Sequence, residues 1–119
     1  LVGASSILLT LVGSGLNAQA FSFNGYLPVK QTQRVQKLKK LEKELERTGY
    51  SQIFIETPYR NDAMLKDILK YLNDQTHLCL GIDLTSPNEQ IVTRKIERWK
   101  KTGIVLKKRQ VVYLIGNPK

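Results

Sequence analysis

Two apolar segments on either side of a helical pattern constrain the fold of this chain more than any other feature. Residues 51–56 (SQIFIE) and 77–83 (HLCLGID) are short apolar runs, which is typical of buried strands. Between them, Asn61 favours a helix N-cap, and one helical face is apolar: Met64, Leu65, Ile68, Leu69 and Leu72. A strand–helix–strand unit of this size forms parallel neighbouring strands with a right-handed crossover. The sequence therefore predicts an α/β protein.

Three further helices are expected. A helix over residues 4–16 places one apolar set on a common face: Ile7, Leu8, Leu11, Val12 and Leu16. A surface helix over residues 31–48 carries a narrower stripe, formed by Val35, Leu38, Leu41 and Leu45, and Gly49 ends it. A short helix is predicted from Thr93, with Ile96 and Trp99 packing it on the core.

The remaining segments complete a sheet. Phe21 and Phe23 alternate before Asn24-Gly25, which predicts a short strand entering a turn. Residues 84–92 contain Pro87 and indicate a loop, and residues 110–115 form a last strand. Because 119 residues are the size of one domain, we expect a single α/β domain over residues 1–119. Its expected architecture is a mixed sheet of about five strands flanked by helices.

The first 20 residues end in Ala18-Gln19-Ala20 and resemble a secretory signal peptide. Such a peptide carries a basic leader, yet the first Lys or Arg is Lys30. The apolar run is also far shorter than the roughly 20 residues that span a bilayer. We therefore expect this segment to be part of the fold and the chain not to enter a membrane. Because it begins with Leu1, we expect a piece of a longer protein.

The positive charge of the chain lies in two clusters. Residues 30–47 hold seven Lys or Arg against three Glu, and residues 94–109 hold eight against one, out of a net charge of +9. Such clusters favour a polyanionic partner, RNA or DNA, because binding to phosphates releases condensed counterions. Basic helix faces that only keep the protein in solution explain the same pattern equally well. Charge alone does not decide the function.

Cysteine and histidine content excludes several classes of site. Cys79 is the single cysteine and His77 the single histidine, so no internal disulfide, structural zinc site or Cys-His nucleophile is expected. Apolar residues at 41% and charged residues at 24% are ordinary globular values and argue against disorder. A reducing cytoplasm fits this composition best.

Ligands of α/β sheets usually bind beyond the carboxyl ends of strands, which indicates residues 56–60 and 84–86 as site candidates. The stretches FNGYLP (23–28), IFIETPYR (53–60) and GIDLT (81–85) together resemble the C-terminal half of the tetrapyrrole methylase family. Within it, they are most similar to the group that methylates ribosomal RNA of the small subunit. Thr57 and Asp83 depart from the Ser and Glu usual in that group.

This resemblance implies an S-adenosylmethionine-dependent methyltransferase whose C-terminal domain is the present chain. The segment Gly3-Ala4-Ser5-Ser6 is similar to the family's entry into the first helix of this half. The residues implied in cofactor binding are Ser5, Ser6, Glu56, Leu84 and Thr85. The family's glycine-rich loop belongs to the N-terminal half and has no counterpart here, so we expect these residues alone to be inactive and to bind the cofactor weakly or undetectably.

For the substrate, the resemblance implies methylation of a ribose 2′-hydroxyl in ribosomal RNA by a homodimer. The residues expected to contact the RNA are Asn24, Tyr26, Lys30, Arg34 and Arg60. Two alternatives stay open: a methylase of a tetrapyrrole or other small molecule, and a nonenzymatic RNA-binding domain. Glu56 and Arg60 are also spaced to pair with each other. No residue is identified as a catalytic base.

Overall fold

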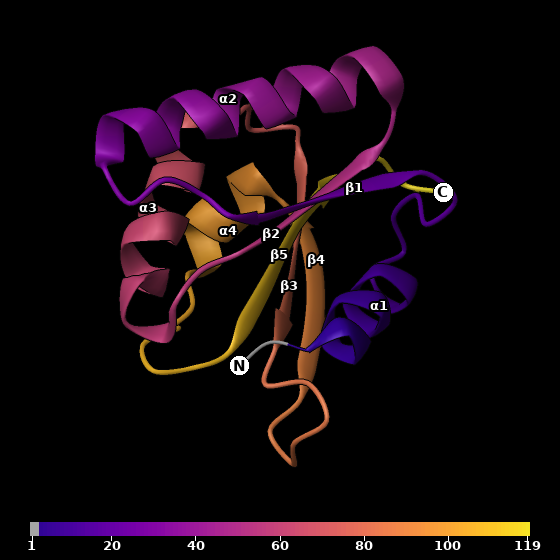
Figure 1. The fold of residues 1–119 in the computed structure, drawn as a ribbon, viewed down its shortest axis with the longest axis vertical. Helices are drawn as coiled ribbons and strands as arrows, with labels where there is room; N and C mark the ends of the chain where they lie inside the picture. Colours follow the sequence, from indigo (N-terminus) through magenta and orange to yellow (C-terminus); the bar gives the residue numbers. More distant parts are fainter. Residues whose placement is uncertain (1–2) are drawn as a thin grey trace.

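A computed structural model describes residues 3–119 as one five-stranded mixed sheet with helices on both faces (Figure 1). The order of the strands is β1-β2-β5-β3-β4. The elements in chain order are α1 (Ala4–Gly13), β1 (Phe21–Tyr26), α2 (Gln31–Thr48), β2 (Ser51–Ile55), the 3₁₀ turn η1 (Pro58–Arg60), α3 (Asn61–Tyr71), β3 (His77–Ile82), β4 (Gln90–Lys95), α4 (Ile96–Thr102) and β5 (Val111–Gly116). The predicted α/β class and mixed sheet are confirmed.

The last strand lies at the centre of the sheet. β5 pairs antiparallel with both β2 and β3. These two strands are therefore parallel to each other, but the prediction that they are neighbours is wrong, because β5 lies between them. Every residue of β5 is buried, and a strand that is apolar throughout is stabilised most between two others. The parallel neighbours are instead β1 and β2, which α2 connects.

The larger part of the core lies between the sheet and α2, α3 and α4. The α2 stripe contributes Leu38, Leu41 and Leu45, all buried. On the sheet, Phe54 and Tyr113 stack with ring centroids 5.3 Å apart. Three helices are thereby fixed over one face of the sheet (Figure 1).

The α1 helix covers the other face, over β3 and β5, and it is rotated from the predicted orientation. Leu11 is buried as expected, but Leu8 and Val12 are 57% and 61% exposed, and the helix ends at Gly13. The buried position beside Leu11 is Thr10 instead, because Gly81 on β3 has no side chain and leaves room for the threonine. The close approach of α1 to Gly81 on β3 therefore decides which face of the helix is buried, and the apolar periodicity does not.

Residues 90–95 form strand β4, although we expected a loop to residue 92 and a helix from Thr93. β4 pairs antiparallel with the whole of β3, from His77–Lys95 to Ile82–Gln90. Residues 90–95 are only partly buried, so burial alone does not explain this strand. It forms because the edge of β3 would otherwise leave backbone N–H and C=O groups unpaired. Helix α4 follows at Ile96 and contributes Trp99, which donates a 2.9 Å hydrogen bond to the Leu78 carbonyl. No helix within residues 3–119 is long and apolar enough to span a bilayer.

Candidate functional site

Three segments that are distant in sequence meet at the carboxyl end of β3 and enclose a cleft of about 390 Å³. They are the start of α1, the turn after β3 and the residues that lead into β5. The lining residues are Gly3, Ser5, Ser6, Gly81, Asp83, Leu84, Thr85, Ser86, Asn88, Gln110 and Val112. Four of the five residues expected to bind a cofactor, Ser5, Ser6, Leu84 and Thr85, therefore share one cleft.

The turn after β3 has a strained backbone. Asp83 and Thr85 adopt positive φ angles of 49° and 68°, and such angles are unfavourable for side chains other than glycine, above all for a β-branched one. Hydrogen bonds hold this conformation. The Asp83 carboxylate accepts from Arg109 Nε and from the Gln110 backbone N–H, both at 2.9 Å, and Glu89 Oε1 accepts from the Thr85 N–H at 2.8 Å. Such enforced strain is typical of functional sites.

The start of α1 presents polar groups to the cleft. Its N-cap is Gly3, which provides no side-chain cap, and the first turn contains no acidic residue. Among residues 3–119, the hydroxyls of Ser5 and Ser6 donate no hydrogen bond. Free N–H groups at a helix start favour electron-rich oxygen atoms of a ligand. Together with the apolar Leu84 and Val112, this lining suits a nucleoside that carries hydroxyl groups.

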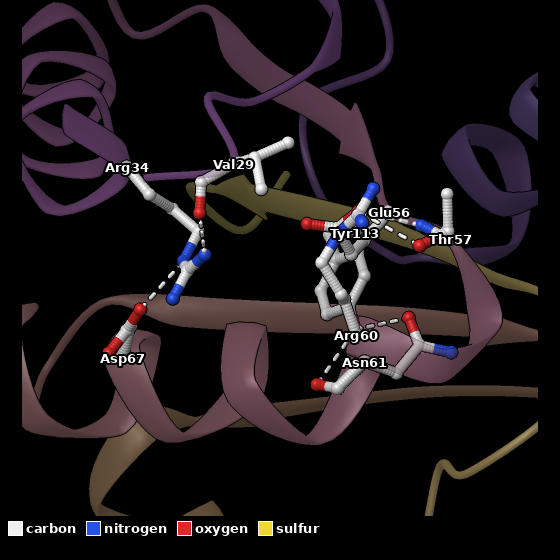
Figure 2. A network of polar contacts seen from close by, with 8 residues as sticks. All are labelled: Val29, Arg34, Glu56, Thr57, Arg60, Asn61, Asp67 and Tyr113. Carbon is white, nitrogen blue, oxygen red and sulfur yellow. Dashed lines mark hydrogen bonds and ion pairs between the residues drawn. The ribbon is translucent and has the colours of Figure 1, made fainter. Parts of the chain in front are cut away.

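Glu56 lies on the other face of the sheet and does not line the cleft. It follows Ile55 on β2, and Figure 2 shows it together with Arg60, Asn61 and Tyr113. Its Oε1 accepts hydrogen bonds from the Thr57 N–H at 2.7 Å and from Arg60 Nε at 3.1 Å. The expected alternative, a pair between Glu56 and Arg60, is thus observed. Its Oε2 is buried without a hydrogen-bond partner among the described residues.

Two of the residues expected to contact RNA make hydrogen bonds within the domain. Arg34 is only 6% exposed, and it donates to Asp67 Oδ2 at 2.7 Å and to the Val29 carbonyl at 2.9 Å (Figure 2). The side-chain amide of Asn24 donates to Gln52 Oε1 at 3.2 Å and also bonds backbone carbonyls. Both side chains are thus engaged within the domain, and their contact with RNA stays a prediction.

The other three expected RNA contacts lie at the surface. Tyr26 is 56% exposed, and Lys30 is exposed at the start of α2. Arg60 is partly exposed, and its guanidinium lies 5.1 Å from the ring centroid of Tyr59. Their contacts with a substrate stay predictions.

Sequence reasoning missed the residues that shape the turn. Arg109 lies in a basic cluster that we interpreted as a polyanion-binding feature, yet it holds Asp83, 26 positions away. Asn61 was expected to cap α3, but Arg60 is the N-cap and the Asn61 side chain bonds elsewhere. Neither set of hydrogen bonds can be predicted from neighbouring residues, because the partners are distant in sequence and only the fold brings them together.

Within residues 3–119, no group of three or more His, Cys, Asp or Glu side chains is arranged to hold a metal ion.

Solved structures share this architecture. The chain superposes on the methyltransferase CobJ with a TM-score of 0.56 at 13% identity, covering 93% of this chain and 47% of that one. For a diphthine synthase the TM-score is 0.62 at 14% identity, covering 93% and 45%, and for a putative diphthine synthase from Entamoeba histolytica it is 0.64 at 12%, covering 95% and 51%. At these identities the likeness shows the fold alone. The fold therefore places this chain in a class of α/β domains, and the matching domain makes up about half of each of these three solved chains.

Curated sequences identify the relatives more closely, although no family model matches the chain. Ribosomal RNA small subunit methyltransferase I of Vibrio cholerae is 36% identical over 91 residues, covering 76% of this chain and 30% of the relative. The enzyme of that name from Synechocystis is 36% identical over 88 residues, covering 74% and 30%. That from Buchnera aphidicola (Baizongia pistaciae) is 31% identical over 117 residues, covering 96% and 39%.

The chain is a homologue of the ribosomal RNA small subunit methyltransferases I and belongs with them to the tetrapyrrole methylase family. The resemblance seen in FNGYLP, IFIETPYR and GIDLT is thereby confirmed. The chain spans only about a third of the length of the curated relatives that it matches.

Proposed function

We propose that this chain is the C-terminal domain of an S-adenosylmethionine-dependent methyltransferase that methylates a ribose 2′-hydroxyl in ribosomal RNA of the small subunit. One observation carries the proposal: Ser5, Ser6, Leu84 and Thr85 converge in a single strand-end cleft. The curated homologues, ribosomal RNA small subunit methyltransferases I, support methyl transfer as the reaction and ribosomal RNA as the substrate class.

The cleft fits the cofactor in size and chemistry. Its volume of about 390 Å³ lies within the usual range of small-molecule sites, roughly 300–1,000 Å³. We assign the hydroxyls of Ser5, Ser6 and Thr85 to the polar groups of the cofactor and the side chains of Leu84 and Val112 to its base. Asp83, the one acidic side chain in the lining, is engaged by Arg109 and does not compete for these contacts.

When bound, S-adenosylmethionine supplies a methyl group already activated by the sulfonium charge. The tasks left to this domain are to orient the cofactor and to exclude water, and positioning of this kind lowers a barrier by about 7–11 kcal/mol. The strained, hydrogen-bonded turn at Asp83–Thr85 suits the first task because it fixes two cofactor contacts before binding.

Removal of the proton from a ribose hydroxyl requires a base, and the lining offers none that is free. We therefore propose that the second wall of the site, with the base, belongs to the part of the protein that the longer relatives possess and this chain does not include. A homodimer located in the cytoplasm is part of the same proposal.

A chimeric enzyme tests the proposal. This chain replaces its matching segment in the Vibrio cholerae relative, and transfer of labelled methyl groups to small ribosomal subunits is measured. We expect methylation of the ribosomal RNA, and loss of it when Thr85 is replaced by a bulky residue, because the cleft would be filled. A folded chimera that binds S-adenosylmethionine but methylates no RNA would contradict the proposed function.

A further inference from the structure

We propose that Tyr59, Arg60, Lys107 and Lys108 form one platform that binds an unpaired segment of RNA beside the cleft. We call these four residues the strand platform. The inference rests on the proposed function in taking RNA as the partner, and it adds which surface binds the RNA and in which form.

Hydrogen bonds from one buried side chain bring the two halves of the strand platform together. Asn61 follows Arg60 directly, and its Nδ2 donates to the carbonyl oxygens of Leu106 at 3.2 Å and Arg109 at 2.7 Å. The Arg109 N–H donates to the Leu106 carbonyl at 3.1 Å and closes a tight turn. Lys107 and Lys108 form the exposed tip of this turn, and Figure 1 shows residues 104–110 beside the segment before α3.

The support under the strand platform is rigid. Asn61 is fully buried, and the Tyr113 hydroxyl donates to its Oδ1 at 2.8 Å (Figure 2). Lys108 has a positive φ of 64°, a conformation that persists in a lysine only where its surroundings enforce it. A buried polar group whose partners are all present rigidifies the segments it joins. The two lysines are therefore held at a fixed place.

The other half of the strand platform combines an open aromatic ring with a fixed cation. Tyr59 is 75% exposed, and the Arg60 guanidinium lies 5.1 Å from its ring centroid. The buried carboxylate of Glu56 accepts a hydrogen bond from Arg60 Nε at 3.1 Å, which fixes the guanidinium at the partly exposed surface. Stacking on exposed aromatic rings next to cations is how proteins bind single-stranded nucleic acids.

The position of the strand platform relates it to the cleft. Lys108 is two residues from Gln110, which lines the cleft, so at most about 7 Å of backbone separates them. Between them, Arg109 donates a hydrogen bond to Asp83 in the turn after β3. An RNA strand on Tyr59 and the two lysines therefore runs directly past the mouth of the cleft.

Of the aromatic rings within reach of a cation among residues 3–119, Tyr59 is the most exposed. Arg94 stacks 4.9 Å from the Trp99 ring centroid, but Trp99 is only 1% exposed. On the α2–α3 side, Tyr71 is only partly exposed and has two cations, Lys39 and Lys70, each 5.3 Å from its ring centroid, whereas Tyr59 is 75% exposed beside one. Because bases in a duplex are stacked on each other, a ring platform selects unpaired nucleotides.

The test uses the 119-residue chain and fluorescence anisotropy with two labelled probes, an oligouridylate strand and an RNA hairpin of equal length. We expect tighter binding of the oligouridylate. Tyr59→Ala should weaken it by roughly fivefold to a hundredfold, whereas Tyr59→Phe keeps it. Lys107→Gln with Lys108→Gln should lower the slope of log K against log salt by about 1.4, the value for two phosphate contacts to a single strand.

Matched controls lie at other exposed positions of the same residue types. They are Tyr50→Ala and the double variant Lys40→Gln/Lys43→Gln, each expected to change binding less than twofold. Equal losses in the controls, preference for the hairpin, or no binding of either probe by the unaltered chain would overturn the strand platform.

Titration of the chimeric enzyme with S-adenosylmethionine separates the two proposals. RNA binding that depends on the strand platform, in a chimera that binds no cofactor, would contradict the proposed function and leave the platform standing. Cofactor binding in the cleft, with platform variants that behave like the controls, would contradict the platform alone.

Discussion

Arg34 and Asp67 form a buried ion pair that joins α2 to α3. The Nε–Oδ2 distance is 2.7 Å, and the side chains are only 7% and 3% exposed. The Val29 carbonyl also accepts from Arg34, and Gln31 donates to the second carboxylate oxygen at 3.2 Å. The pair is therefore well enclosed and holds the first turn of α2 against α3.

Removal of one partner of this pair should destabilise the domain strongly. Asp67→Ala leaves the Arg34 charge buried without compensation, and we expect a loss of about 3–5 kcal/mol in the free energy of unfolding. Replacement of both residues by apolar side chains of similar volume should restore most of it. Urea denaturation measures both changes. A loss below about 1 kcal/mol for Asp67→Ala, the value of an exposed pair, would contradict the buried pair.

Gly81 is the position at which the sheet and α1 come closest. A Cβ atom added there would overlap Thr10 Oγ1 and lie 2.9 Å from Thr10 Cβ. Gly81→Ala should therefore displace α1 and cost at least about 1–3 kcal/mol by overpacking. The matched control is Gly3→Ala, whose Cβ meets nothing within 4 Å. Equal midpoints of thermal unfolding for the two variants would show that α1 does not pack as described.

Asn61 should matter more for stability than an exposed asparagine. Asn61→Ala removes the 2.8 Å acceptor of the buried Tyr113 hydroxyl and the side-chain amide that donates to the Leu106 and Arg109 carbonyls, so we expect a loss of about 2–4 kcal/mol in the free energy of unfolding. Hydrogen exchange at the Arg109 amide should also accelerate, because the turn loses its anchor. Asn88→Ala, at an exposed position, is the control and should change neither quantity.

Cys79 predicts a stability change at alkaline pH. Burial raises the pKa of its thiol from the usual 9.0 to about 11, against a smaller opposite effect of a hydrogen bond with Thr93. The folded state therefore holds this proton more tightly, and the associated stability is complete below pH 9 and is lost as the pH rises toward 11. Two pKa units correspond to about 2.7 kcal/mol.

The comparison with Cys79→Ala isolates this effect. The variant has lower stability at neutral pH because of its cavity, but its free energy of unfolding should fall less steeply between pH 9 and 11. Tyr113, whose pKa burial also raises, is present in both proteins and cancels in the difference. Parallel curves for the two proteins over this pH range would contradict the assignment.

Local patterns in the sequence predicted the elements whose packing follows periodicity. The stripe Leu38, Leu41 and Leu45 placed α2, and the apolar run of β5 predicted a strand. What failed depends on partners distant in sequence. β4 is a strand because β3 offers an unpaired edge, and Leu8 is exposed because Gly81 draws Thr10 toward the sheet.

In the candidate site, too, some residues could be predicted from the sequence and others could not. Ser5, Ser6, Leu84 and Thr85 were expected together from the family resemblance, and the topology brings them together because α1 starts where β3 ends. Arg34 is an arginine in a basic cluster, and nothing near it in sequence indicates that Asp67 buries it. The strand platform could not be predicted, since 47 positions separate Arg60 from Lys107 and only the Asn61 hydrogen bonds unite them.

The most direct test of the cofactor cleft is a titration of the isotope-labelled chain with S-adenosylmethionine, followed residue by residue through NMR amide shifts. We predict weak binding, since the proposed function assigns one wall of the site to a part of the protein outside this chain. The shifts should be confined to the cleft: Ser5, Ser6, Leu84, Thr85 and Gln110. Shifts centred elsewhere, or none at millimolar cofactor, would contradict the assignment of this cleft.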